Sequence, residues 1–479
     1  VLFRGNTEAE IRKKIIKSGI IKAIIGLPSN LFFGTGIPAC ILLLDKENAQ
    51  SRKGIFIIDA SKEFVKNGNK NRLRARDIHK IVDTFEKQLE IPKYSRLVSF
   101  SEISDKNEYN LNITRYVDNQ EKDDYQDIEA HLKGGIPTSN IDEMDYFWNV
   151  CPKLRNSLFS SINRDGYEKL NINKSKVKEI IFENSEFKKV LDKIEKSYVE
   201  WKVKHKDLLN EFKIKTSPKE TITIISEDIL EKFKKIELIN HYDVYQNLMA
   251  YWEDIMQDDM YLISQNGWDA GIFPIKDKND EETGWDSELL PKNIIIEKFF
   301  EKENKELDEI QSKVDEINQK MELMDEENEG KDEDFFSEAR SDSDKITKNM
   351  ILKRIKDIEK DPEFIEELNV LEKYRELLKN SAELKKQLKS QEKKLDENLF
   401  KKYKTLTKLE IKEIVIEDKW FFTIKNLLDK EMEKISQNLS RRIIELVERY
   451  EITLPSLIKE TETYSYKIHN HLKKMGFQW

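Results

Sequence analysis

The chain has 479 residues, of which 37% are charged and 38% hydrophobic, and its formal net charge is −9. This length allows two or three domains with real cores, but the net charge excludes a generic polyanion binder, so any nucleic-acid contact needs a local basic patch. The chain has only two cysteines, Cys40 and Cys151, which excludes a disulfide scaffold and a cysteine-based zinc site. The sequence has no signal peptide and no long apolar run, which predicts a cytoplasmic protein.

The first hundred residues predict a compact α/β region. Apolar spacing predicts a helix over 8–18, and short apolar runs predict strands over 20–26, 39–45 and 54–59. A second helix is predicted over 76–89, followed by a strand over 97–100. The face of this helix that should pack into the core carries Ile78, Ile81, Val82 and Phe85. This order is typical of the back half of a doubly wound sheet with an antiparallel hairpin at its edge. Without a front half, such a sheet would expose a hydrophobic inner edge.

Between the first two strands lies an unusual loop, which combines Phe32 and Phe33 with Asn30, Gly34 and Gly36. Glycines permit a left-handed backbone and close approach to a ligand, and nothing local explains an exposed aromatic there. The loop is therefore a candidate binding element. The alternative is a plain hairpin loop whose aromatics pack back onto the core.

A basic stretch, residues 66–76, carries five basic residues and no acidic one. Asn67, Gly68 and Asn69 predict a turn within it. A basic loop suits contact with phosphates, because each neutralised phosphate releases a counterion. The alternative is an ordinary solvated loop.

The rest of the chain is predicted to be mainly helical. A short helix over 128–135 should stop at Gly134 and Gly135, and longer helices are expected over 176–204, 225–233 and 241–256. The segment 268–291 predicts a loop, and 322–344, with eleven acids against two bases, predicts disorder. Asp258 and Asp259 have no ligand cluster near them, so no metal site is predicted.

Four apolar seams follow 3–4 spacing in the last third of the chain, as in coiled coils. They run over 307–324, 371–395, 428–450 and 454–475. Such seams need partners. They can pair with one another inside the chain or pack against another subunit.

Several segments, in order, resemble the M (modification) subunit of type I restriction-modification systems, a family of S-adenosylmethionine-dependent DNA adenine-N6 methyltransferases. The segments are VLFRG (1–5), EIRKKII (10–16), GLPSNLFFGTGIPACILLL (26–44), FIIDAS (56–61), NRLRARDIHKIV (71–82), YNLNITRYVD (109–118), HLKGGIP (131–137) and HLKKMGF (471–477). The resemblance implies an α/β remnant, the back half of a Rossmann-like methyltransferase sheet, followed by a mainly α-helical region with long coiled-coil helices.

The resemblance also implies four parts. Residues 1–118 would be the C-terminal half of the catalytic domain, 119–173 a linker and partner-contact segment, 174–297 a helical domain, and 298–479 coiled-coil helices that dock on the S (specificity) subunit. The further partners implied are a second M subunit, the R (restriction) subunit and double-stranded DNA.

Two motifs that carry the family's chemistry are missing from the chain: the glycine-rich loop that holds the methyl donor and the Asn-Pro-Pro-Phe type motif that binds the flipped adenine. The sequence therefore predicts the C-terminal portion of an M subunit, inactive alone. The intact family enzyme uses S-adenosylmethionine, but this chain alone is not expected to bind it, and no catalytic, cofactor-binding or metal residue is assigned.

In related adenine methyltransferases an aromatic of the corresponding loop stacks on the extruded base, which makes Phe32 the first candidate and Phe33 the second, with Asn30 beside them. Arg72, Arg74 and Arg76 are candidates for phosphate contacts. The competing hypothesis is a non-enzymatic coiled-coil scaffold; it accounts for the C-terminal half but not for residues 1–118.

Overall fold

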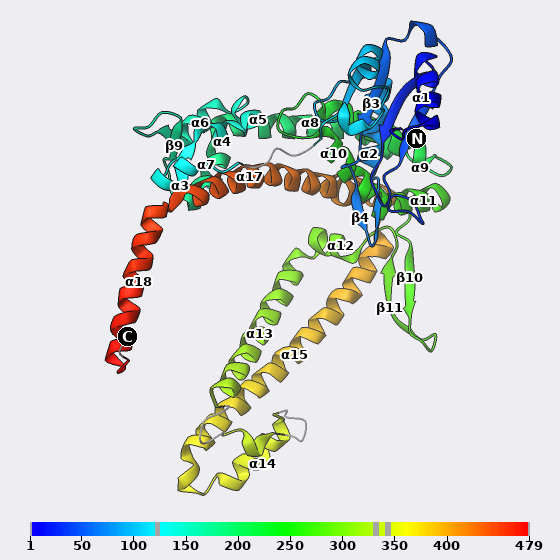
Figure 1. Cartoon of the computed structure of the whole chain (residues 1–479). Coiled ribbons are helices and arrows are strands. Elements are labelled where there is room, and N and C mark those ends of the chain that lie inside the picture. The colour runs from blue at the N-terminus through cyan, green and yellow to red at the C-terminus, as the bar shows by residue number, and fades with distance from the viewer. Residues whose placement is uncertain (1, 120–124, 329–334, 341–345, 478–479) are drawn as a thin grey trace. The chain divides into compact units, whose positions relative to one another are not determined.

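The computed structural model describes residues 2–119, 125–328, 335–340 and 346–477 (Figure 1). The chain forms two compact units. Unit 1 comprises Val1–Glu211, Ser217–Asp258 and Phe421–Trp479, and unit 2 comprises Phe212–Thr216 and Asp259–Trp420. Among the described residues, no helix is both long and apolar enough to cross a membrane. The domain limits expected at 118, 173 and 297 remain predictions.

Unit 1 begins with a four-stranded sheet of strand order β2-β1-β3-β6. The central strand β1 (Ile21–Gly26) pairs antiparallel with β2 (Cys40–Leu44) and parallel with β3 (Gly54–Asp59), and β6 (Ser95–Ser99) pairs antiparallel with β3. The four predicted strands and the antiparallel hairpin at the edge are thus confirmed.

Helices and loops cover both faces of this sheet. Ile24 and Ile57 belong to one core with Ile16 of α1 (Thr7–Lys17), whereas Ile25 and Phe56 belong to a second core with Ile81 of α2 (Ala75–Glu86). Successive side chains of a strand point to opposite faces, which explains the split. Every residue of β3 is buried, as expected for a strand covered on both sides.

The inward face of α2 differs from the prediction. Ile81 is buried and Phe85 is partly buried, but Ile78 and Val82 are exposed. The buried side of the helix also includes polar residues, Asp77, Asp83 and Thr84. The apolar pattern was misleading because ion pairs and hydrogen bonds allow polar side chains to occupy inward positions.

Strand β2 forms one end of the sheet and exposes large apolar side chains. Ile41, Leu42 and Leu44 are each more than 40% exposed, and among the described strands only β1 pairs with β2. An apolar edge strand of this kind invites another strand to pair with it. This end of the described sheet is therefore an exposed, apolar edge.

The middle of unit 1 is a small three-stranded sheet with short helices. The strands are β7 (Ile136–Pro137), β9 (Tyr167–Leu170) and β8 (Phe159–Ser161), and the helices are α3 (Ile128–Lys133), α4 (Thr138–Asp142), α5 (Asp145–Trp148) and α6 (Pro152–Leu158). As predicted, the first helix ends at the glycine pair: Gly134 has φ 76° and Gly135 has φ 86°.

Unit 1 also contains the short helix α7 (Val177–Glu183) and four longer helices: α8 (Ser185–Asn210), α9 (Pro218–Phe233), α10 (His241–Tyr251) and α17 (Phe422–Glu451). The third apolar seam lies on α17, is buried, and packs against α7 and α10. The fourth seam lies on α18 (Leu454–Lys474), where no residue is buried.

Unit 2 contains a long pair of helices, α13 (Glu301–Asn328) and α15 (Ile365–Thr405), which pack together and run in opposite directions (Figure 1). The first two seams therefore pack within the chain. The other elements are α11 (Gln257–Asn266), β10 (Ile272–Lys276), β11 (Glu282–Ser287), α12 (Lys292–Phe299), α14 (Lys348–Ile358) and α16 (Lys408–Glu413).

One prediction for unit 2 is wrong, and a second is wrong for the described part of its range. The expected loop over 268–291 contains the β10–β11 hairpin, in which Pro274 is paired with Trp285. The expected disordered segment over 322–344 continues as α13 to Asn328, and Phe336 and Ala339 are buried in a core with Tyr374. Packing of the Phe336 side chain against that of Tyr374 thus gives the described part of this segment a fold despite its acidic composition. Residues 329–334 and 341–345 lie outside the described part of the chain.

Candidate nucleic-acid interface

The loop between β1 and β2 presents its aromatic side chains to solvent. Phe33 is 93% exposed and Phe32 is 50% exposed. Asn30, with φ 53°, and Gly34, with φ 80°, adopt the left-handed backbone that shapes the loop. Phe33 thus does not pack back onto the core, and its ring is free to stack on a flat partner.

The basic stretch is a β-hairpin rather than an irregular loop. Strand β4 (Val65–Asn67) pairs with β5 (Lys70–Arg72), and the turn is made at Gly68, with φ 58°. The predicted turn is confirmed. The pairing gives the basic residues a defined position on the surface.

Hydrogen bonds join this hairpin to the aromatic loop. The backbone N–H of Asn71 donates to the carbonyl of Asn30 at 3.0 Å, and the Asn71 side-chain amide donates to the carbonyl of Ser29 at 2.7 Å. The Lys70 ammonium donates to the carbonyl of Phe32 at 3.0 Å and lies 5.9 Å from the centroid of the Phe33 ring. Exposed aromatics and a lysine therefore share one surface, called here the aromatic–basic surface.

Arg72 ends the hairpin and stays accessible. Its guanidinium pairs with Glu253 at 3.1 Å, and both side chains are more than half exposed. An exposed pair of this kind contributes at most about 1 kcal/mol. Because the pair is weak, a phosphate can replace the carboxylate at Arg72.

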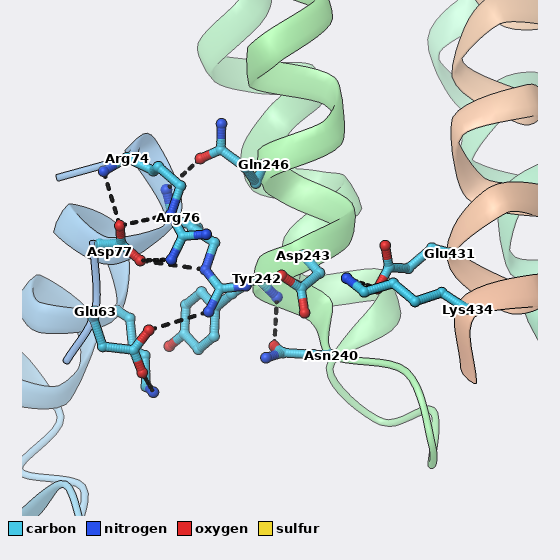
Figure 2. A network of polar contacts seen from close by, with 11 residues as sticks. Glu63, Arg74, Arg76, Asp77, Asn240, Tyr242, Asp243, Gln246, Glu431 and Lys434 are labelled. Carbon is cyan, nitrogen blue, oxygen red and sulfur yellow. Dashed lines mark hydrogen bonds and ion pairs between the residues drawn. The ribbon is translucent and has the colours of Figure 1, made fainter. Parts of the chain in front are cut away.

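Arg74 and Arg76 lie in a different environment, shown in Figure 2. Arg74 makes two hydrogen bonds to the Asp77 carboxylate, at 2.9 and 3.0 Å. Arg76, only 14% exposed, pairs with Glu63 at 3.1 Å, with Asp77 at 3.3 Å and with Asp243 of α10. Carboxylates thus occupy both guanidinium groups.

This network joins α2 to α10. Besides the Arg76–Asp243 pair, the backbone N–H of Arg76 donates to the side-chain oxygen of Gln246 at 3.1 Å (Figure 2). Desolvation alone would raise the pKa of Asp77, but the hydrogen bonds and positive charges of Arg74 and Arg76 outweigh it and hold that pKa below its usual range. The site is a structural joint between two helices rather than an open surface.

No metal site accompanies the aromatic–basic surface. Within the described ranges, no group of three or more His, Cys, Asp or Glu residues could hold a metal ion. Asp259 is instead bound to Lys419 at 2.7 Å and to the Trp420 indole at 2.8 Å.

The described residues also do not fit S-adenosylmethionine. A donor-binding turn leads from a parallel strand into a helix, whose N-terminal N–H groups face the ligand. Here the glycine-rich loop connects the antiparallel strands β1 and β2. The Asp59 carboxylate, at the end of β3, already accepts hydrogen bonds from Ser61 and Asn119.

Of the six candidate residues, four lie on or beside the aromatic–basic surface: Asn30, Phe32, Phe33 and Arg72. Arg74 and Arg76 lie in the joint of Figure 2. Sequence reasoning missed the roles of Lys70 and Asn71. The only signal for them was the basic composition of 66–76, and nothing in it indicates a contact with residues some forty positions earlier.

Comparison with known proteins gives matches that each cover about a quarter of the chain. Residues 1–125 match the family model described as N-6 DNA Methylase. The chain is 41% identical over 136 residues to the type I restriction enzyme MjaVII methylase subunit of Methanocaldococcus jannaschii, covering 28% of this chain and 23% of the relative. It is 37% identical over 130 residues to the MpnII methylase subunit of Mycoplasma pneumoniae, covering 27% and 24%.

A solved structure, the type I restriction-modification system methyltransferase subunit from Streptococcus thermophilus, is 45% identical over 25% of each chain, with a TM-score of 0.23. The chain thus spans about a quarter of the length of the relatives it matches. The resemblance to type I methylase subunits is confirmed for this region.

Proposed function

We propose that this chain, whose first 125 residues match the family model described as N-6 DNA Methylase, is part of the M subunit of a type I restriction-modification system. The intact subunit would methylate adenine N6 in DNA with S-adenosylmethionine as donor. The family match carries this proposal, because it covers the sheet, the aromatic loop and the basic hairpin together. A coiled-coil scaffold would leave this match unexplained.

The role proposed for the aromatic–basic surface is to hold an extruded adenine. A base removed from its stack loses a few kcal/mol, and an aromatic face returns about 1–3 kcal/mol. Phe32 and Phe33 offer such faces, while Lys70 and Arg72 supply positive charge for the neighbouring phosphates. The residues described here hold the base and its backbone; the methyl donor and the groups that bind the adenine amine belong to other residues of the intact enzyme.

The exposed edge of β2 supports the proposal that the four-stranded sheet is the back half of a Rossmann-like methyltransferase sheet. Its apolar side chains are of the kind that central strands bury on both faces. A strand of a catalytic front half would pair along β2 and cover Ile41, Leu42 and Leu44.

A genome-wide measurement tests the activity without knowledge of the target sequence. Single-molecule sequencing detects N6-methyladenine, so genomic DNA from the source cell should carry it at one sequence motif. Deleting the gene should remove methylation from that motif alone. An unchanged methylation pattern in the deletion strain would contradict the proposed activity.

Removing the loop aromatics should slow methylation. For the intact enzyme assembled with its partners, we expect Phe32→Ala and Phe33→Ala together to lower kcat/KM for methyl transfer to duplex DNA by about tenfold or more, since one lost stacking contact is worth about 1–3 kcal/mol. The matched control is Ile37→Ala, which truncates an exposed apolar side chain of the same loop. Equal rates for the double variant and this control would exclude stacking.

The proposed partner of α18 is the specificity subunit. The helix carries a full apolar seam, yet Leu457, Tyr464 and Ile468 are all exposed. A second M subunit and the R subunit would complete the assembly on duplex DNA. In this arrangement, the specificity subunit reads the target sequence and this chain supplies methylation.

Charges in the seam should prevent assembly. We expect Leu457→Asp with Ile468→Asp to abolish co-purification with a co-expressed specificity subunit from the same source cell, because two carboxylates would have to be buried in a helical interface. Ser456→Asp with Thr463→Asp is the control, since it adds the same two carboxylates at exposed polar positions of the same helix. Co-purification of the seam variant at the wild-type level would rule out this docking site.

A further inference from the structure

The second half of α15 is strongly basic in an acidic protein. Residues 385–404 contain eight lysines and three acidic residues, whereas the whole chain has a net charge of −9. One of the three acids, Asp396, is already paired with Lys292 at 2.9 Å. The helix therefore carries a local excess of positive charge.

The lysines gather on the solvent side of the helix pair. Leu388, Leu395 and Leu399 mark the face that packs inward. The opposite face carries six exposed lysines, called here the lysine stripe, whose spacing of 3, 4 and 8 residues brings them to the same side of the helix. They are Lys386, Lys389, Lys393, Lys394, Lys401 and Lys404. At 1.5 Å per residue, the stripe is roughly 27 Å long.

The lysine stripe is only partly offset by acidic residues, because within 386–404 Glu397 shares its face and leaves six lysines against one carboxylate. Across the described part of the chain, no ion pair joins Lys386, Lys389 or Lys393 to a carboxylate. Lysines of α13 differ: Lys305 pairs with Glu301 at 2.5 Å, and Lys320 pairs with Glu316 at 2.7 Å. Unpaired like charges on one helix face repel one another, and a polyanion would remove this cost.

We propose that the lysine stripe of α15 binds the phosphate backbone of duplex DNA without reading its sequence. A duplex carries one negative charge per about 1.7 Å of its axis, so the stripe faces a dense row of phosphates. Its length of roughly 27 Å is most of one turn of DNA, which is about 34 Å. Lysines at 3- and 4-residue spacing supply point charges without the fork that reads base edges. The choice of DNA as the polyanion rests on the proposed function; the stripe itself is independent of the aromatic–basic surface.

Binding of the full chain to a 30-base-pair duplex of G·C pairs, measured by fluorescence anisotropy over a range of salt, tests the proposal. This duplex contains no adenine, so the result does not depend on methylation or base extrusion. We expect Lys386→Gln/Lys389→Gln/Lys393→Gln to weaken binding about tenfold near 0.1 M salt. The slope of log K against log salt should fall by roughly 2 to 3, because each phosphate contact contributes about 0.9.

The matched control is Lys276→Gln/Lys305→Gln/Lys320→Gln, which removes the same charge from lysines of unit 2 that are paired with carboxylates. It should bind the duplex like the wild type. Equal weakening by both triple variants, or none by the stripe variant, would overturn the proposal. Binding of polyglutamate as tight as that of the duplex would show that the stripe takes an acidic polypeptide instead.

Discussion

Asp77→Ala is expected to lower the free energy of unfolding of unit 1 by about 3 kcal/mol. The Asp77 side chain is fully buried between Arg74 and Arg76 and also accepts a hydrogen bond from the backbone N–H of Arg74 at the start of α2. Removing one partner of a buried ion pair leaves an uncompensated charge, which costs about 3–5 kcal/mol. Arg76 keeps Glu63 and Asp243, so the lower end of this range applies.

Urea unfolding, with hydrogen exchange of the α2 and α10 amides to assign the transition to unit 1, measures this loss. The control is Glu433→Ala, because Glu433 pairs with Lys178 where both side chains are about half exposed, and it should leave the midpoint unchanged. An Asp77→Ala midpoint equal to that of the control would mean that the network of Figure 2 does not stabilise the joint.

The same joint should weaken in acid. The pKa values of Asp77, Glu63 and Asp83 all lie below their usual range, so the stabilisation is present above the ordinary carboxyl pKa and is lost as pH falls through the folded values. The gap in stability between wild type and Asp77→Ala should therefore shrink below about pH 4. A gap that stays constant from pH 7 to pH 3 would contradict an ionic origin.

Lys419→Met is expected to destabilise unit 2 by about 3–5 kcal/mol. The Lys419 ammonium is buried and donates to Asp259 at 2.7 Å and to the carbonyl of Leu289 at 2.8 Å. Burial lowers the pKa of Lys419, an effect that the Asp259 carboxylate opposes. Without the lysine, the Asp259 charge would remain buried with the Trp420 indole N–H as its donor.

A double variant separates the charge from the packing. Asp259→Asn keeps an acceptor for Trp420 but removes the charge, so Lys419→Met with Asp259→Asn should recover much of the stability lost in Lys419→Met. Chemical unfolding, followed by hydrogen exchange in α11 and the 414–421 segment, gives the loss of stability of Lys419→Met and of the double variant. Strict additivity of the two single changes would show that the pair is not coupled.

The sequence was sufficient for most of the local structure in residues 1–118, although the β4–β5 hairpin was expected only as a loop with a turn. Apolar runs such as 54–59 and the helix over 8–18 depend on neighbouring residues, and the structure has both within a residue or two. The sequence was not sufficient where residues distant in the chain determine which side chains are buried. Ile78 was expected inside because it is apolar, yet Asp77 takes the inward position since Arg74 and Arg76 compensate its charge.

The candidate site shows the same limit. The exposed aromatics and the basic stretch could each be found from composition. They lie side by side, however, because Lys70 and Asn71 donate hydrogen bonds to residues 29–32. Similarly, the arginines at 72, 74 and 76 look equivalent in sequence. Only the positions of Glu63, Asp77 and Asp243 show that Arg74 and Arg76 belong to a largely buried network, whereas Arg72 pairs with an exposed carboxylate.

The order of units along the chain has a consequence for synthesis on the ribosome. Helix α17, which completes the core of unit 1, follows the roughly 160 residues of unit 2. At 5–20 residues per second, that delay lasts roughly 10–30 s. During this interval Trp201 lacks Phe421, the residue directly before α17, against which its ring packs in the finished protein. The nascent chain should therefore need a chaperone until α17 has left the ribosome.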